Sequence, residues 1–344
     1  MLKYFLSSLI FTAIGLLLAV LLGLSHQQSG RVLAMTVFTT MILAVLEISL
    51  SFDNAIVNAL ILKNMSKVWR KRFLTWGLLI AVFGVRLILP LLIVSFFATV
   101  NPWQALMMAA QQPQQYAQLM LSSRLQVAAF GGSFLLLVTS HYFFSQEHRV
   151  LWIHSIEAPL RRWGKRSWIA FLPALLILAI LTIFLPAAEK SSFLYASSGG
   201  VVTYAAVEAL TRWLKVSGKT LHTASAGMFF YLEVLDASFS FDGVVGGFAI
   251  TQDLFIIMIG LSIGAFFVRS LTLMFVEEGT LTEFTYLEQG AFYAIGALAL
   301  LMLAEPFVTV PEWCTGTIGA LIIGLSFRSS LQARKESAGP KQLK

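Results

Sequence analysis

Two stretches of the chain place the same pattern of carboxylates and hydroxyls inside apolar sequence. Residues 46–54 read LEISLSFDN and residues 235–243 read LDASFSFDG. The acids of the two copies, with one more acid a helical turn before the second, are Glu47, Asp53, Asp236, Asp242 and Glu233. If these stretches lie in a membrane, each charged group costs about 2.5–3.5 kcal/mol at the bilayer centre. We therefore expect arginines, protons or a bound cation to compensate the carboxylates.

A cation site is the chemistry that these residue types favour. The carboxylates, the Asn54 amide and the hydroxyls of Ser51 and Ser240 are hard oxygen donors, and neither copy contains Cys or His. Such donors suit Mn²⁺, Mg²⁺ or Ca²⁺ rather than Cu⁺ or Zn²⁺. Two arginines in other apolar segments, Arg86 and Arg269, would pair with carboxylates, but five acids still leave surplus negative charge. A proton relay alone and purely structural ion pairs remain as alternatives, and each serine could equally serve helix packing.

Helical geometry separates the two acids within each copy. At 100° per residue, Glu47 and Asp53 lie about 120° apart, and the second copy repeats this spacing. Both acids of one copy therefore cannot face one ion from an unbroken helix. Either each helix unwinds, at residues 51–54 and 243–247, or the two acids have different partners. An unwound segment would also offer backbone carbonyls as ligands.

The amino-acid composition indicates whether these segments lie in water or in a membrane. Hydrophobic residues make up 58% of the 344 residues and charged residues only 12%, about half the charged fraction of soluble domains. The mean hydropathy is +0.80. We therefore predict an all-α polytopic membrane protein. The single cysteine excludes a disulfide framework and a thiolate metal cluster.

Ten apolar segments are long enough to cross a bilayer, which takes about 20 residues. They lie near 4–24, 33–62, 73–99, 125–145, 168–187, 193–211, 224–250, 254–276, 288–306 and 313–328. We expect the first to be a retained helix rather than a signal peptide, and the polar stretch 111–118 to be a loop. With both termini in the cytoplasm, 19 of the 24 Lys and Arg residues lie inside, as the positive-inside rule requires. This split explains the net charge of +7 without nucleic acid.

The repeated motif predicts two inverted halves. The motifs fall on the second and seventh segments, which an odd number of segments separates, so the copies must be antiparallel. Arg86 and Arg269 recur in the same order on the third and eighth segments. We predict five-helix repeats at residues 1–190 and 191–328, followed by a basic cytoplasmic tail at 329–344. Inverted repeats of this kind hold the substrate near the midplane in many secondary transporters.

The motif resembles a known family. EISLSFDN at Glu47–Asn54, with its echo around Asp242, is similar to the acidic signature of the TerC-type integral membrane proteins, which are named for tellurium resistance. Members of that family are implicated in manganese efflux and metal homeostasis. The resemblance thus implies metal-pathway roles for the matching residues Glu47, Asp53, Asn54, Asp236 and Asp242. Gly243 replaces the asparagine in the second copy, so the implied site is asymmetric.

The leading hypothesis is a secondary transporter that exports a divalent cation, with Mn²⁺ favoured over Ca²⁺ and Mg²⁺, in exchange for protons. The accessory residues of this hypothesis are Ser51, Ser240, Glu233, Arg86 and Arg269. The alternative is a membrane partner without transport activity that acts in metal stress or tellurite resistance, docked through the cytoplasmic basic loops.

The remaining expectations concern chemistry and location. The acids of the two motif copies occupy symmetric positions, and the sequence contains no further catalytic signature. We therefore do not expect an enzyme. We expect no permanently bound cofactor, because the cation is cargo, and no nucleic-acid partner. The lipid bilayer is the expected surrounding, and the charge asymmetry favours a bacterial inner membrane with both termini in the cytoplasm.

Overall fold

The computed structural model describes residues 2–25, 30–97, 99–146, 150–164, 167–217, 221–279, 284–308 and 311–338. All regular structure in these residues is helical. The helices are α1 (Leu2–Ser25), α2 (Gly30–Leu50), α3 (Phe52–Leu62), α4 (Lys67–Arg72), η1 (Phe73–Gly77), η2 (Ile80–Ile88), α5 (Leu89–Phe97), α6 (Pro102–Gln111), α7 (Pro113–Ser122), α8 (Arg124–Phe144), α9 (His154–Trp163), η3 (Ser167–Ala170), α10 (Phe171–Phe184), α11 (Ala187–Ser217), α12 (Leu221–Ile250), α13 (Leu254–Glu277), α15 (Leu287–Ala304) and α16 (Glu312–Ala338).

The helices are those of an all-α polytopic membrane protein, as the composition predicts. Each of the ten predicted segments coincides with helix, and seven stretches in the described part are long and apolar enough to cross a membrane. The peripheral helices turn large apolar side chains outward. Leu17 on α1 is 59% exposed and Ile183 on α10 is 69% exposed. In water such a surface would be unfavourable, whereas lipid tails solvate it.

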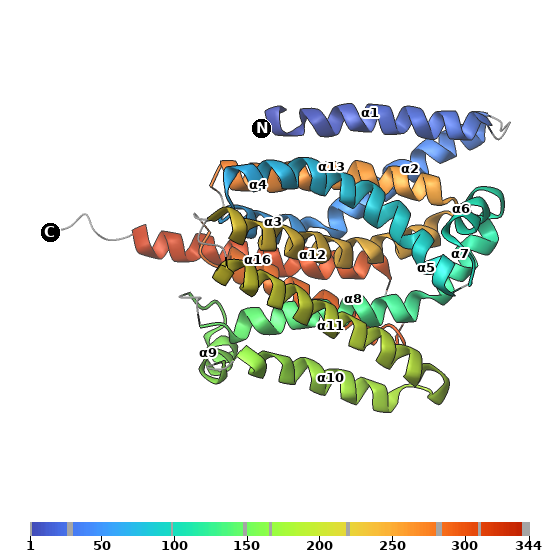
Figure 1. The fold of residues 1–344 in the computed structure, drawn as a ribbon. Coiled ribbons are helices and arrows are strands. Elements are labelled where there is room, and N and C mark those ends of the chain that lie inside the picture. The colour runs from blue at the N-terminus through green and yellow to red at the C-terminus, as the bar shows by residue number, and fades with distance from the viewer. Residues whose placement is uncertain are drawn as a thin grey trace.

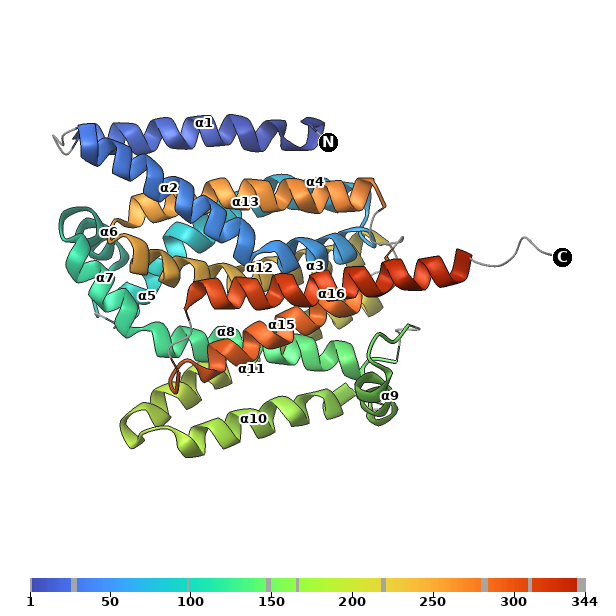
Figure 2. The same cartoon turned by 180° about the vertical axis from the view of Figure 1, so that it is seen from behind.

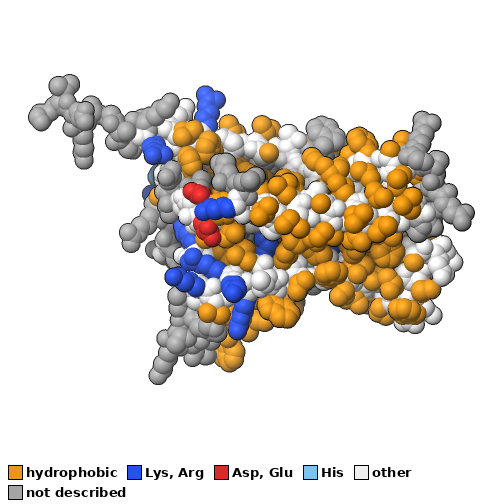
Figure 3. All heavy atoms as spheres, turned by 90° about the horizontal axis from the view of Figure 1, so that it is seen from above, with side chains coloured by type: hydrophobic (Ala, Val, Ile, Leu, Met, Phe, Trp, Pro, Cys, Tyr) orange, Lys and Arg blue, Asp and Glu red, His pale blue; other side chains and the backbone are white. Residues whose placement is uncertain are grey.

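The long helices run side by side along one axis, with both chain ends at the same end of the bundle (Figures 1 and 2). The short helices α6 and α7 lie at the opposite end, and α9 lies at the end that carries the termini. Lys and Arg side chains gather at this terminal end, while the rest of the same face is largely apolar (Figure 3). We call it the basic end.

The two motif helices lie in the middle of the bundle. α3 runs toward the basic end and α12 runs away from it, so they are antiparallel (Figure 1). α12 packs against both α2 and α3, and α13 packs against the same two helices from another side. Packed helices therefore bury Glu47, Asp53 and Asn54 of the first copy and Ser238 and Ser240 of the second, whereas Ser49 is exposed.

The two copies of the motif differ in backbone. The first is interrupted at Ser51, where φ is −104° and ψ is 15°, so that α2 ends and α3 begins. The chain still bonds across this point, with Ser51 N donating to Glu47 O at 2.9 Å, so the interruption is a kink rather than an unwound loop. Of the two alternatives, unwinding does not hold at 243–247, because α12 is continuous from Leu221 to Ile250 despite its glycines.

Two stretches differ from the predictions, and the proposed border between the repeats lies within a helix. The stretch 111–118 is mostly helical, because Pro113 occupies the first turn of α7 and the buried Tyr116 and Met120 anchor it. The proposed border between residues 190 and 191 falls inside α11. α16 continues to Ala338, beyond the predicted end of the last segment and into the predicted tail.

Candidate functional site

A buried ion pair joins the first motif to the neighbouring π-helical segment. Glu47 Oε1 accepts from Arg86 Nη2, and both residues are only 2% exposed. Ser51 Oγ donates to the same carboxylate oxygen at 3.1 Å. Arg86 is held from its own helix as well, since its Nη1 donates to Ala81 O at 2.8 Å. These bonds fix the Glu47 carboxylate in place and neutralise its charge.

The second motif is connected to the first by an amide. Asn54 Nδ2 donates to Asp236 Oδ1 at 2.6 Å, and Asp236 is only partly buried. At the corresponding position of the other copy, a Cβ on Gly243 would lie 3.0 Å from Glu47 Oε2. Each copy therefore places the last residue of its motif against the first acid of the other copy. The longer side chain of Glu47 lies against a glycine, and the shorter side chain of Asp236 lies against an asparagine.

These contacts surround a small cavity between the two motif helices. Its volume is about 20 Å³, which is room for about one water molecule. The residues that line it include carboxylates of both copies, both arginines and three neutral oxygen donors, namely Glu47, Asp236, Arg86, Arg269, Ser51, Asn58 and Thr272. Asn58 Oδ1 and Asn54 Oδ1 are buried and accept no hydrogen bond from the described residues. Asn58 lines the cavity, so its oxygen remains available as a ligand there, whereas Asn54 does not line it.

Arg269 and Glu233 complete the charges around this cavity. A Cβ on Gly77 would lie 2.3 Å from Glu233 Oε1 and 2.9 Å from Arg269 Nη2, so only glycine admits both groups here. The Arg269 guanidinium also lies 4.3 Å from the ring centre of Phe73, a cation–π contact. Among the described residues, two carboxylates and two guanidiniums therefore line the cavity, and the Glu233 carboxylate lies next to the Arg269 guanidinium beside it. The surplus negative charge favours a cation or a proton.

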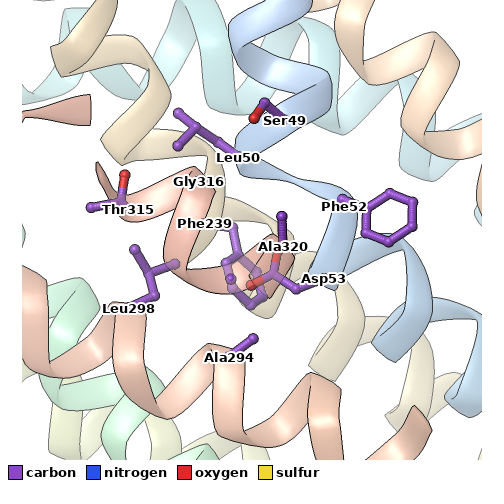
Figure 4. A pocket seen from close by; sticks show the side chains of 11 residues that line it. Ser49, Leu50, Phe52, Asp53, Phe239, Ala294, Leu298, Thr315, Gly316 and Ala320 are labelled. Carbon is purple, nitrogen blue, oxygen red and sulfur yellow. The ribbon is translucent and has the colours of Figure 1, made fainter. Parts of the chain in front are cut away.

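Asp53 faces a different part of the bundle. Its side chain points into a pocket of about 10 Å³ between α2, α3, α12, α15 and α16, whose lining includes Phe239, Ala294 and Ala320 (Figure 4). Asn54 N donates to Asp53 Oδ1 at 2.9 Å. The carboxylate therefore lies in the first turn of α3, where the helix dipole favours negative charge. Within the described part of the chain, no cationic side chain pairs with it.

The structure thus groups the predicted residues in two places. Glu47, Asn54 and Asp236 come together with Arg86 and Arg269, whereas Asp53 lies apart, as its position on the helix predicts. Ser240 is buried, and the side chain of Asp242 lies outside the described residues. No three His, Cys, Asp or Glu side chains in the described part are close enough to hold a metal ion. An ion in the cavity would rely on two carboxylates and neutral oxygens.

A larger cavity opens at the basic end. It has a volume of about 510 Å³ and lies between α3, α8, α11, α12 and α15. His141 Nε2 lies 3.2 Å from Glu208 Oε1 within it, and Glu208 also pairs with Arg212. His141 and Glu208 are not among the functional residues predicted from the sequence. The available signal was that Glu208 and His141 each lie in an apolar helix. The two residues are too distant in the sequence to be paired without knowledge of the fold.

The comparisons with known proteins place the chain in a family. Residues 52–337 match the family model described as Protein of unknown function (DUF475). Because the match covers most of the sequence, the chain belongs to this family. A search of the curated proteins and a search of the solved structures each found no match. The family description names neither a substrate nor a TerC-type relationship.

Proposed function

We propose that this DUF475 family member is a secondary transporter that moves a divalent cation through the cavity between Glu47 and Asp236. One observation carries the proposal: carboxylates from both motif copies line a buried space of about 20 Å³. Oxygen-only ligands favour Mn²⁺, Mg²⁺ or Ca²⁺. The resemblance to TerC-type proteins favours Mn²⁺ among these ions, and export as the direction.

The residues have different roles in this proposal. Asp236 and the unpartnered oxygen of Asn58 bind the ion, while Glu47, already held by Arg86, supplies the second carboxylate and Asn54 positions Asp236. Arg269 repels the ion and so assists release. Weak binding suits a transporter, because an ion held by many charged ligands would not leave. This agrees with a site that has two carboxylates rather than three.

Asp53 is the proton carrier in this proposal. Its carboxylate is 5% exposed and pairs with no cation among the described residues, so a proton removes the cost of burying its charge. Asp242, at the matching position of the second copy, is proposed to share this role. The basic end then faces the cytoplasm of a bacterial inner membrane, and the large cavity beside His141 is the mouth through which the ion arrives.

The test is ion flux in liposomes that contain the purified full-length protein, with Mn²⁺ followed by quenching of an internal fluorophore. We expect wild type to transport Mn²⁺, Asp236→Asn to reduce the initial rate at least tenfold, and Asp53→Asn to abolish its dependence on a proton gradient. Glu189→Gln, which removes an acid outside the cavity, is the matched control and should retain the wild-type rate.

The opposite outcomes are equally informative. Wild-type flux that Asp236→Asn leaves unchanged would make the carboxylates structural. Wild-type protein that moves none of Mn²⁺, Mg²⁺ and Ca²⁺ above empty liposomes would favour the membrane partner without transport activity.

A further inference from the structure

A separate cavity lies at the basic end between α4 and α13. Its volume is about 220 Å³. Half of its lining is aliphatic and three of the remaining residues are basic; the members are Leu62, Leu74, Leu273, Val276, Lys67, Arg70, Lys71 and Glu277. The Glu47 cavity and this one share no lining residue.

The basic side chains of this cavity are positioned by the fold. Arg70 Nε donates to Met65 O at 3.0 Å and its Nη2 donates to Lys63 O, which fixes the guanidinium against the turn between α3 and α4. A guanidinium has five N–H donors, so further donors remain. Lys67 and Lys71, one helical turn apart on α4, are exposed. Three positive charges therefore face one carboxylate, and the cavity attracts an anion.

The surroundings of the cavity match the boundary between headgroups and lipid tails. On the same helical stretch, Val68 is 51% exposed and Trp76 is 64% exposed, as expected for side chains that face lipid. The Arg72 guanidinium lies 4.6 Å from the Trp69 ring centre. Aromatic and basic residues together are typical of the membrane interface. An occupant of this cavity therefore meets water at one side and acyl chains at the other.

We propose that this cavity binds the headgroup of an anionic phospholipid. The phosphodiester lies among Lys67, Arg70 and Lys71, and the upper part of an acyl chain packs on Leu74 and Leu273. A free phosphate would leave the aliphatic half of the lining unused, so the lipid is the ligand that fits both halves. Basic pockets between spanning helices at the cytoplasmic side are suited to anionic headgroups. The proposal does not depend on cation transport.

Native mass spectrometry of the purified full-length protein with phosphatidylglycerol and phosphatidylcholine tests the proposal. We expect one tightly retained phosphatidylglycerol, and roughly tenfold weaker retention in Lys67→Gln/Lys71→Gln. Lys63→Gln/Arg162→Gln removes the same charge from the same end outside the cavity and should retain the lipid. Lys67→Arg/Lys71→Arg keeps the charge and should also retain it, which separates lost charge from misfolding.

Two outcomes would overturn the proposal. Equal loss in the cavity variant and the Lys63/Arg162 variant would show attraction to the whole basic end rather than a site. Equal retention of phosphatidylglycerol and phosphatidylcholine by wild type would show that the cavity does not select a negative charge.

Discussion

The first acids of the two motif copies, Glu47 and Asp236, are chemically similar but have different surroundings. Glu47 is 2% exposed, pairs with Arg86 and accepts a further bond from Ser51. Asp236 is only partly buried and is held by the amide of Asn54. The helix of the first copy is kinked at Ser51, whereas that of the second is continuous.

This difference favours separate roles for the two acids, one that holds the site in place and one that binds the ion. A buried charge that pairs with an arginine and accepts a further hydrogen bond is expensive to move, because separating it from its partner exposes both to an apolar interior. Glu47 is such a charge. An acid held by one neutral amide exchanges that amide for an ion at lower cost. We therefore expect Glu47 to anchor the site and Asp236 to respond to the ion.

The most direct test of this asymmetry compares the free energies of unfolding of the Glu47→Gln and Asp236→Asn variants. Glu47→Gln leaves Arg86 buried without a counter-charge and is expected to cost about 3–5 kcal/mol of unfolding free energy. Asp236→Asn keeps an oxygen that accepts from Asn54 and is expected to cost about 1 kcal/mol. Reversible unfolding in mixed micelles, followed by circular dichroism, measures both.

A double variant provides the control for this comparison. Glu47→Leu/Arg86→Leu removes both charges and should recover much of the stability lost in Glu47→Gln, because replacing a whole buried pair by apolar residues is often neutral. If Glu47→Gln and Asp236→Asn cost the same, the two copies are equivalent and the proposed division of roles is wrong.

The contact between the copies predicts a smaller effect for Asn54→Ala. The 2.6 Å bond from Asn54 to Asp236 ends on a charged acceptor, and losing such a bond costs about 1.5–3 kcal/mol. Asn64→Ala is the matched control, since Asn64 Nδ2 donates to the neutral Leu60 O at 3.2 Å and should cost about 1 kcal/mol. A double-mutant cycle with Asp236→Ala should show coupling above 0.5 kcal/mol. Additive costs would mean that Asn54 acts through other neighbours.

Much of this arrangement follows from the sequence, and the exceptions have physical reasons. Hydropathy predicts the helices, and 100° per residue predicts that Asp53 faces away from Glu47. Unwinding was one of two alternatives for both motif helices, and the structure has only a kink, at Ser51. The glycines at 243–247 leave α12 continuous, because glycines in a helix do not require a break when neighbours pack closely. Gly243 is instead the place where α12 approaches Glu47. The large cavity beside His141 could not be foreseen, because its walls come from five helices distant in the chain.

The smallest effect concerns Gly243 itself. A Cβ there would lie 3.0 Å from Glu47 Oε2, and Glu47 cannot retreat, because Arg86 holds its carboxylate and Gly264 lies directly against its Cβ. We expect Gly243→Ala to lose about 1 kcal/mol of unfolding free energy, since the crowding exceeds the gain in helix propensity.

Gly324 on α16 offers the matched comparison, because a Cβ there meets nothing within 4 Å. Gly324→Ala should therefore gain about 0.5–1 kcal/mol in the same unfolding measurement. If both alanines stabilise the protein equally, Glu47 has room to move, and the asymmetry between Asn54 and Gly243 reflects descent rather than packing. Opposite signs would mean that the second copy lacks an asparagine because the carboxylate of the first copy occupies its place.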